Sequence, residues 1–132
     1  MPELPEVETI RRTLKERILY RPIQGIDVSY PKVLRNCDQG QLEKALLGRC
    51  FTRLDRRGKY LVCCLDSEYR LVIHLRMTGR LVVVPIDTAV EKHTSIRIHL
   101  QEDLDLRLVD QRKFATVDLL SGRDWGAIRG LE

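Results

Sequence analysis

The sequence lacks any apolar run long enough to cross a lipid bilayer, which takes about 20 consecutive apolar residues. Its N-terminus, Pro-Glu-Leu-Pro-Glu-Val-Glu, is acidic and lacks the basic segment followed by an apolar one that marks a secretory signal. Repeats, linkers and low-complexity segments are also missing, and the composition is neither collagen-like nor disordered. We therefore expect a cytoplasmic protein.

Cysteine and histidine are few, and their spacing does not suit a metal site. No two cysteines form a CxxC pair, and the histidines do not complete a zinc-ligand pattern. Two of the cysteines are adjacent inside an apolar run, which favours buried thiols. We predict neither a metal nor a disulfide framework. The residues concerned are Cys37, Cys50, Cys63, Cys64, His74, His93 and His99.

The composition is that of one compact domain. The chain has 132 residues, of which 43% are hydrophobic and 32% charged, so a buried core with a solvated surface is expected. The net charge is +4 and the isoelectric point is about 9.0. This balance fits a nucleic-acid partner, although on charge alone a generic basic surface explains it equally well.

Two stretches have the periodicity of amphipathic helices. Apolar residues recur at spacings of three and four from Leu4 to Ile18, which predicts a helix from about residue 3 to Tyr20. Pro5 is tolerable in its first turn. A second helix is predicted after an Asp38 cap, with Gly48 as its stop and an apolar face made of Leu42, Leu46 and Leu47.

The rest of the pattern is typical of strands. A strand at 24–30 ends at Pro31. Hairpin connections are predicted at 66–68 and 101–103. The fold class predicted is α+β: an antiparallel β-sandwich with an N-terminal helix and one further helix. The remaining strands are expected near 50–56, 59–66, 69–75, 80–85, 94–101, 104–110 and 114–120.

The N-terminus carries possible chemistry. If Met1 is removed, Pro2 has a free secondary amine, and an α-amino group is partly neutral near physiological pH. A neutral amine can attack carbon and form an imine-type adduct, and Glu3 and Glu6 offer carboxylates for proton transfer. The competing interpretation is a proline and acids in the first turn of a helix, which is ordinary capping. If Met1 is retained, the Pro2 nitrogen is an amide and cannot be the nucleophile.

The whole opening string favours the chemical interpretation. Met-Pro-Glu-Leu-Pro-Glu-Val-Glu-Thr-Ile-Arg-Arg resembles the start of the formamidopyrimidine-DNA glycosylases, the bacterial 8-oxoguanine repair enzymes. Leu4 favours this branch over the endonuclease VIII branch, which typically has glycine there. Later segments that resemble the family, in its order, are Arg56-Arg57-Gly58-Lys59-Tyr60-Leu61, Ile73-His74-Leu75-Arg76-Met77-Thr78-Gly79-Arg80, Glu91-Lys92-His93 and Asp110-Gln111-Arg112-Lys113-Phe114.

The resemblance implies roles for the matching residues. Pro2 is the nucleophile, Glu3 the proton donor to the opening sugar, Glu6 an organiser of the site, and Lys59 a catalytic-site lysine. Met77, Arg112 and Phe114 correspond to the triad that fills the space of an extruded base, and His74 and His93 to DNA-contacting histidines. Taken singly, each has a plainer interpretation: a solvated lysine or arginine, core Met and Phe, or structural histidines.

The resemblance also implies an activity and a domain organisation. The family excises 8-oxoguanine and formamidopyrimidines from duplex DNA through a Schiff base and then cleaves the strand, without a redox or nucleotide cofactor. Residues 1–132 correspond to its N-terminal catalytic domain. The helix–two-turn–helix module and the C-terminal zinc finger that follow in the family have no pattern here, so we expect no zinc and a weakly active or inactive domain.

Three alternatives stay open at this point. The chain is a non-catalytic DNA-binding or interaction module that keeps the fold, a glycosylase of the endonuclease VIII branch acting on oxidised pyrimidines, or an excised domain without a function of its own.

Overall fold

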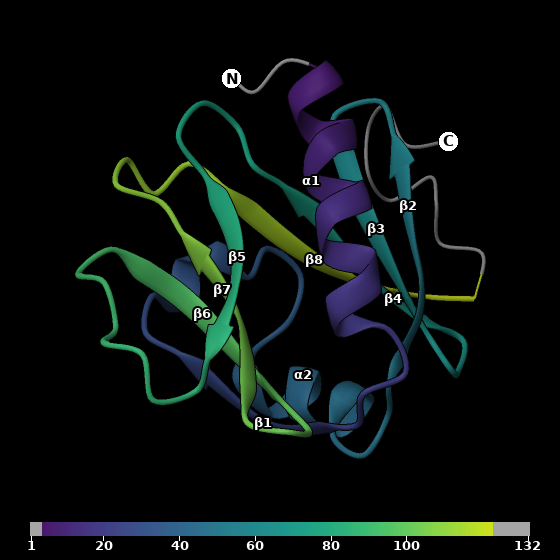
Figure 1. Ribbon diagram of the computed structural model, residues 1–132. Helices are drawn as coiled ribbons and strands as arrows, with labels where there is room; N and C mark the ends of the chain where they lie inside the picture. Colours follow the sequence, from purple (N-terminus) through teal and green to yellow (C-terminus); the bar gives the residue numbers. More distant parts are fainter. Residues whose placement is uncertain (1–3, 123–132) are drawn as a thin grey trace.

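Two four-stranded antiparallel sheets form the body of the protein, and the computed structural model describes residues 4–122 (Figure 1). The first sheet has the strand order β2-β3-β4-β8 and the second β1-β6-β7-β5. The first contains β2 (Phe51–Arg57), β3 (Tyr60–Leu65), β4 (Tyr69–His74) and β8 (Thr116–Ser121); the second contains β1 (Ile23–Val28), β5 (Arg80–Pro85), β6 (Thr94–Leu100) and β7 (Leu104–Val109). The predicted α+β sandwich is confirmed.

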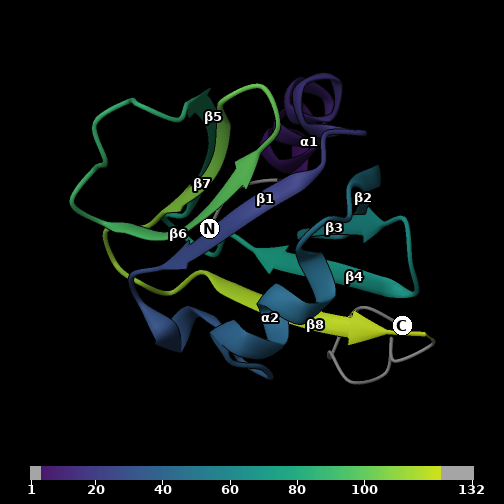
Figure 2. The same cartoon turned by 90° about the horizontal axis from the view of Figure 1, so that it is seen from below.

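Helical segments close the two sides on which the sheets have free edges. Helix α1 (Leu4–Ile18) packs against β2 and β5, the edge strands of the two sheets on one side. Helix α2 (Gln39–Leu46) packs against β1, and the chain before it runs beside β8, where Asn36 exchanges two hydrogen bonds with the backbone of Leu119. Figure 2 shows one helix on each side of the sandwich. No helix within residues 4–122 is long and apolar enough to span a membrane.

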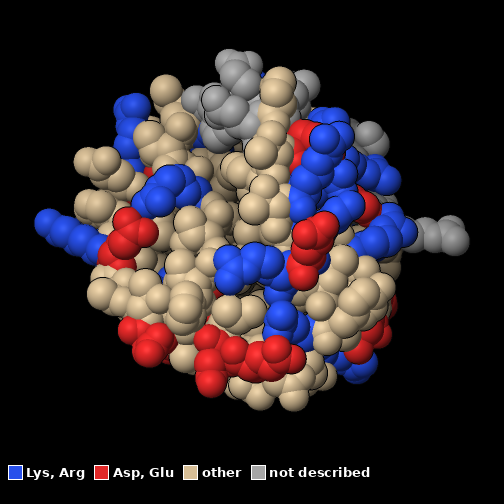
Figure 3. All heavy atoms as spheres, viewed as in Figure 1, with Lys and Arg blue, Asp and Glu red and all other residues tan. Residues whose placement is uncertain are grey.

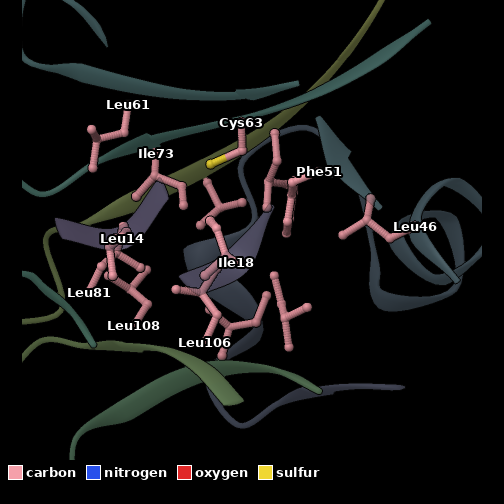
Figure 4. Close-up of a cluster of buried hydrophobic side chains, with 14 of the residues drawn as sticks. Leu14, Ile18, Leu46, Phe51, Leu61, Cys63, Ile73, Leu81, Leu106 and Leu108 are labelled. Carbon is pink, nitrogen blue, oxygen red and sulfur yellow. The ribbon is translucent and has the colours of Figure 1, made fainter. Parts of the chain in front are cut away.

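The core lies between the sheets and under α1. Val7, Leu14 and Ile18 have the helical spacing predicted from the sequence and are almost fully buried. Figure 4 shows Leu14 and Ile18 of α1 among side chains from both sheets. Burial of this many aliphatic side chains, at about 25 cal/mol per Å² of apolar surface, is the main stabilising term of the fold.

The cap predicted for the second helix is confirmed, but its predicted apolar face is only partly correct. The Asp38 carboxylate accepts from the Gln41 amide at 2.8 Å, and the Gln41 side chain accepts from the Asp38 amide, which is a complete capping box. Gly48 has a positive φ of 79°, as a helix stop requires. Leu47 was wrongly assigned to the buried face: it leaves the helix in an extended conformation and is 42% exposed.

Strand positions agree with the alternation in the sequence, with two local differences. The strand predicted at 24–30 is Ile23–Val28, and Pro31–Val33 then forms a 3-10 helix, η1. The strand predicted to start at Phe114 starts at Thr116, because Lys113 has a positive φ of 60° and the chain before it folds back as a loop. The turns predicted at 66–68 and 101–103 do join β3 to β4 and β6 to β7.

Candidate nucleic-acid interface

Several matched segments lie at one end of the sandwich. The turn between β2 and β3 and the β4–β5 loop at 75–79 lie at the top of Figure 1, as does the start of α1, and the β7–β8 loop at 110–115 lies at the upper left. Strand directions explain this placement: β4 and β8 are antiparallel, and β5 and β6 both run antiparallel to β7, so the β5–β6 loop crosses from one end to the other and the β7–β8 loop returns to the same end as the β4–β5 loop. We call this region the loop end.

Three side chains predicted to act together do gather at the loop end. Met77 is 56% exposed and Phe114 50%, so neither side chain is part of the buried core. The Arg112 guanidinium lies between them, with Nη1 3.9 Å from the Met77 sulfur and Cζ 5.1 Å from the centroid of the Phe114 ring. The plainer interpretation of Met77 and Phe114 as core residues is therefore wrong.

Buried polar groups hold the two loops that carry these side chains. Asp110 is 1% exposed, and its carboxylate accepts from the Arg112, Phe114 and Ala115 amides and from the Thr78 hydroxyl of the other loop. Burial alone would raise the pKa of Asp110, but these hydrogen bonds lower it below its ordinary value. Sequence reasoning assigned no role to Asp110 beyond its place in a matched segment, although aspartate side chains commonly accept from backbone amides in turns, as Asp110 does from Arg112.

His74 is buried at the end of β4 and is neutral. Its Nδ1 accepts from the Arg76 amide at 3.0 Å, and its ring packs edge-on against Tyr60, with centroids 4.7 Å apart. Burial, reinforced by the nearby charges of Arg76, Lys59 and Arg35, lowers the pKa of His74 to about 4. With Nδ1 as an acceptor, the remaining ring nitrogen carries the proton, so His74 offers a neutral N–H rather than a cation.

Lys59 lies beside Gly58 in the tight turn between β2 and β3, where Gly58 has a positive φ of 59°. Lys59 is half-buried, and its charge acts on His74, so the structure brings together these two predicted site residues. The ammonium group of Lys59 and the neutral ring N–H of His74 are both donors that suit a phosphate oxygen.

His93 belongs to a separate hollow beside the triad. The His93 carbonyl accepts from the Asp110 amide at 3.0 Å, which ties the β5–β6 loop to the same point. The hollow has a volume of about 760 Å³ and reaches α1 at Ile10. Its lining combines the two loops with the β5–β6 loop: Ile10, Met77, Thr78, Gly79, Arg80, Glu91, Lys92, His93, Val109 and Gln111.

An arginine cluster fixes the position of α1 relative to the β2–β3 hairpin. The Glu8 carboxylate accepts from Arg11 at 2.6 Å, from Arg12 at 3.0 Å and from Arg56 at 3.1 Å. Hydrogen bonds from Arg11 and then Arg56 lower the pKa of Glu8 to about 2. Figure 3 shows basic side chains over α1 and β2 with acidic ones among them. Sequence reasoning missed Glu8, because its partner Arg56 lies 48 residues away.

Only part of the predicted nucleophile segment lies within the described residues. Pro2 and Glu3 lie outside the described residues, and Glu6 lies in the first turns of α1, which begins at the loop end. Within residues 4–122, potential metal ligands do not gather in groups of three or more. Cys63 is buried, and burial raises the pKa of its thiol to about 12; Cys64 is half-buried.

Comparison with known proteins places the chain in one family. Residues 1–117 match the sequence model of the formamidopyrimidine-DNA glycosylase N-terminal domain, and the chain belongs to that family. Formamidopyrimidine-DNA glycosylase of Moorella thermoacetica is 43% identical over 99% of this chain and 48% of its own length; that of Halalkalibacterium halodurans is 43% identical over 94% and 46%. The chain thus spans about half the length of these curated relatives.

Solved structures give the same result for the fold. The Lactococcus lactis enzyme in complex with DNA containing an abasic site superposes with a TM-score of 0.88 and 38% identity, over 96% of this chain and 46% of that one. The same enzyme in complex with FAPY-dG-containing DNA covers 95% of this chain and 46% of its own, with a TM-score of 0.87 and 38% identity.

Proposed function

We propose that this chain is the nucleophile-bearing domain of a DNA glycosylase and abasic-site lyase that removes oxidised purines in base-excision repair. The observation that carries the proposal is the meeting of Met77, Arg112 and Phe114, exposed at the tips of two loops that are 35 residues apart in sequence. An apolar pair around a guanidinium suits a base stack that has lost one base, because the apolar groups fill the gap. Arg112 then supplies donors to the unpaired partner base.

The proposed chemistry starts at Pro2. After removal of Met1, the lone pair of the Pro2 amine attacks C1′ of the flipped nucleotide, and the bond from C1′ to the base breaks, so the base leaves with the bonding electrons and gains a proton. Glu3 protonates the sugar ring oxygen as the ring opens, which leaves a Schiff base between Pro2 and C1′. Elimination then releases the phosphates on both sides, and Glu6 and Lys59 help to organise the site.

Lys59, His74 and His93 are proposed to contact the DNA backbone. Lys59 and His74 lie together at the loop end, where Lys59 and Arg76 supply positive charge and His74 supplies a neutral N–H donor. His93 lines the hollow together with Met77 and Gln111. Phosphate contacts dominate affinity for DNA and are lost as salt rises.

Oxidised purines, 8-oxoguanine and formamidopyrimidines, are the proposed lesions, supported by family membership and by Leu4 in the opening motif. The isolated 132-residue chain is expected to turn over lesion DNA weakly or not at all. It spans about half of its relatives, and the loss of several phosphate contacts lowers affinity by orders of magnitude. No redox or nucleotide cofactor is required by the proposed steps.

Borohydride trapping tests the nucleophile directly. Intact mass first establishes that Met1 has been removed, and the chain is then incubated with an abasic-site duplex or an 8-oxoguanine:cytosine duplex. We expect a covalent adduct with the abasic duplex, a much weaker one with the 8-oxoguanine duplex, and a reduced yield on both for Pro2→Gly. An absence of adduct on abasic DNA, with Met1 removed and the duplex at a concentration that saturates the chain, would contradict the role of Pro2. Equal yields for wild type and Pro2→Gly would show that the secondary amine of proline has no advantage over the primary α-amine that this variant retains.

A further inference from the structure

We propose that Asp110 is a positioning residue that joins the loops 75–79 and 110–115 into one rigid unit, so that Met77, Arg112 and Phe114 enter a duplex as a block. This inference rests on the proposed function of the three side chains as a wedge. It adds that their joint action depends on a buried carboxylate behind them and on the hydroxyl of Thr78.

The 110–115 loop is wrapped around its own first residue. Asp110 Oδ2 accepts from the Phe114 amide at 2.8 Å and from the Ala115 amide at 2.7 Å, and Oδ1 accepts from the Arg112 amide at 3.1 Å. Because the backbone at Arg112 and Phe114 is held by a charged acceptor, the directions of both side chains are set before DNA arrives.

The second loop is attached at the same carboxylate. The Thr78 hydroxyl donates to Asp110 Oδ1 and spans 32 residues of sequence. Next to it, a Cβ added at Gly79 would stand 2.5 Å from the Leu75 carbonyl oxygen of its own loop and 3.1 Å from the Ala115 Cβ of the other loop. The bases of the two loops are therefore both hydrogen-bonded and in direct contact.

The tips of the loops are held much more weakly than their bases. Arg112 reaches the Met77 sulfur at 3.9 Å and the Phe114 ring at 5.1 Å, and both apolar side chains are about half exposed. Such contacts exchange readily for contacts with bases, whereas the buried base keeps its shape. A preorganised wedge avoids the cost of ordering two loops when the duplex opens.

Thr78→Val tests the hydrogen bond between the two loops, because valine has the shape of threonine but lacks its hydroxyl. The three hydrogen bonds from backbone amides to Asp110 stay in place. Thr78→Ser, which restores a hydroxyl, is the rescue variant. Thr88→Val, at an exposed threonine away from both loops, is the matched control. Asp110→Asn is the stronger variant, since the amide cannot accept at both oxygen positions.

Amide hydrogen exchange in the 132-residue chain measures the coupling without DNA. In Thr78→Val we expect the Phe114 and Ala115 amides to exchange about tenfold faster, and in Asp110→Asn faster still. Thr78→Ser and Thr88→Val should match the wild type. Unchanged exchange in Thr78→Val would overturn the coupling.

Two DNA substrates distinguish a role of Asp110 and Thr78 in positioning the wedge from a role in general stability. An abasic-site duplex requires the wedge to open the stack, whereas the same strands with a three-nucleotide bubble are already open. Thr78→Val should lose about tenfold in affinity for the intact duplex and keep its affinity for the bubble. Equal losses on both substrates would overturn the positioning role. Failure of the wild type to bind either DNA would instead contradict the proposed function, and the exchange data would still decide whether the loops are coupled.

Discussion

Two regions of this domain contain the same pair of residue types in opposite electrostatic settings. At the loop end, a buried aspartate, Asp110, begins the 110–115 loop, and a buried histidine, His74, ends β4 directly before the 75–79 loop. On the outer face of the second sheet, Asp105 is fully buried and binds His99, with Nδ1 of the ring facing Oδ1 of the carboxylate. The comparison shows how the surroundings of a side chain decide its charge.

His74 is surrounded by positive charge, whereas His99 is held between carboxylates. Burial, Arg76, Lys59 and Arg35 all lower the pKa of His74. Burial alone would also lower the pKa of His99, but hydrogen bonds to Asp105 and then Asp27 raise it above its ordinary value. The outer face therefore neutralises its own charges. The loop end keeps a positive field that a polyanion is suited to meet.

The largest expected change in the free energy of unfolding comes from substitution of Arg107, on the outer face of the second sheet. This guanidinium is 2% exposed, donates to Asp105 at 3.0 Å and donates to the carbonyls of Ile86, Thr88 and Ala89 in the β5–β6 loop. Arg107→Met should lower the free energy of unfolding by about 3–5 kcal/mol, because it leaves a buried carboxylate short of its cation. Urea denaturation measures the loss.

The double variant Asp105→Asn with Arg107→Met is the control for this prediction. It removes both charges and should recover part of the stability, because no buried charge is left without a partner. A loss below about 1 kcal/mol in Arg107→Met would show that the outer face is not held by this ion pair.

The next largest expected effect is a loss of folding stability at acid pH that is caused by His74. The unfolded histidine takes a proton near pH 6.5, but the folded one does so only near pH 4, so the unfolded state binds more protons between these values. Stability is therefore lost as the pH falls from about 6.5 to 4, by about 3 kcal/mol from this group alone. His74→Asn, which keeps an acceptor for the Arg76 amide, should remove this part of the slope in urea denaturation at pH 7 and pH 4.5.

DNA sharpens the same measurement. Phosphates bound beside Lys59 and Arg76 would offset their charges and raise the pKa of His74, which an NMR titration with and without an abasic-site duplex detects. An unchanged pKa at saturating DNA would place the DNA away from this histidine.

How far the sequence predicts the molecule depends on whether a feature is local. The α1 periodicity and the Asp38 cap concern neighbours within four residues, so both were predicted correctly. Leu47 was misplaced because apolar spacing does not show where a helix ends. Phe114 was placed in a strand because the turn that diverts the chain depends on Asp110, whose partners are set by the folded loop. The wedge, formed by loops far apart in sequence, followed only from the family resemblance.

The smallest expected effect on folding stability is that of His99. Its dependence on pH has the opposite sign to that of His74. Because the folded pKa is raised above the unfolded value of about 6.5, the folded state holds the proton more tightly. The stabilisation is complete below pH 6.5 and is lost as the pH rises through the folded pKa. Nε2 of the ring contacts Asp27 at 2.8 Å, and Asp27 also pairs with Arg97 at 3.2 Å, so part of the network survives without the histidine.

His99→Gln keeps a polar side chain of similar length but cannot become charged. It should therefore be less stable than the wild type by about 1 kcal/mol at pH 5.5 and by less at pH 8.5, as measured by urea denaturation at both values. A deficit that is equal at both pH values would mean that His99 contributes packing against Gly25, where its ring lies so close that an added Cβ would stand 2.8 Å from Cδ2. In that case the contrast between the two regions would rest on His74 alone. A deficit present only at the lower pH would establish that the outer face uses its histidine as a cation, whereas the loop end holds its own histidine neutral.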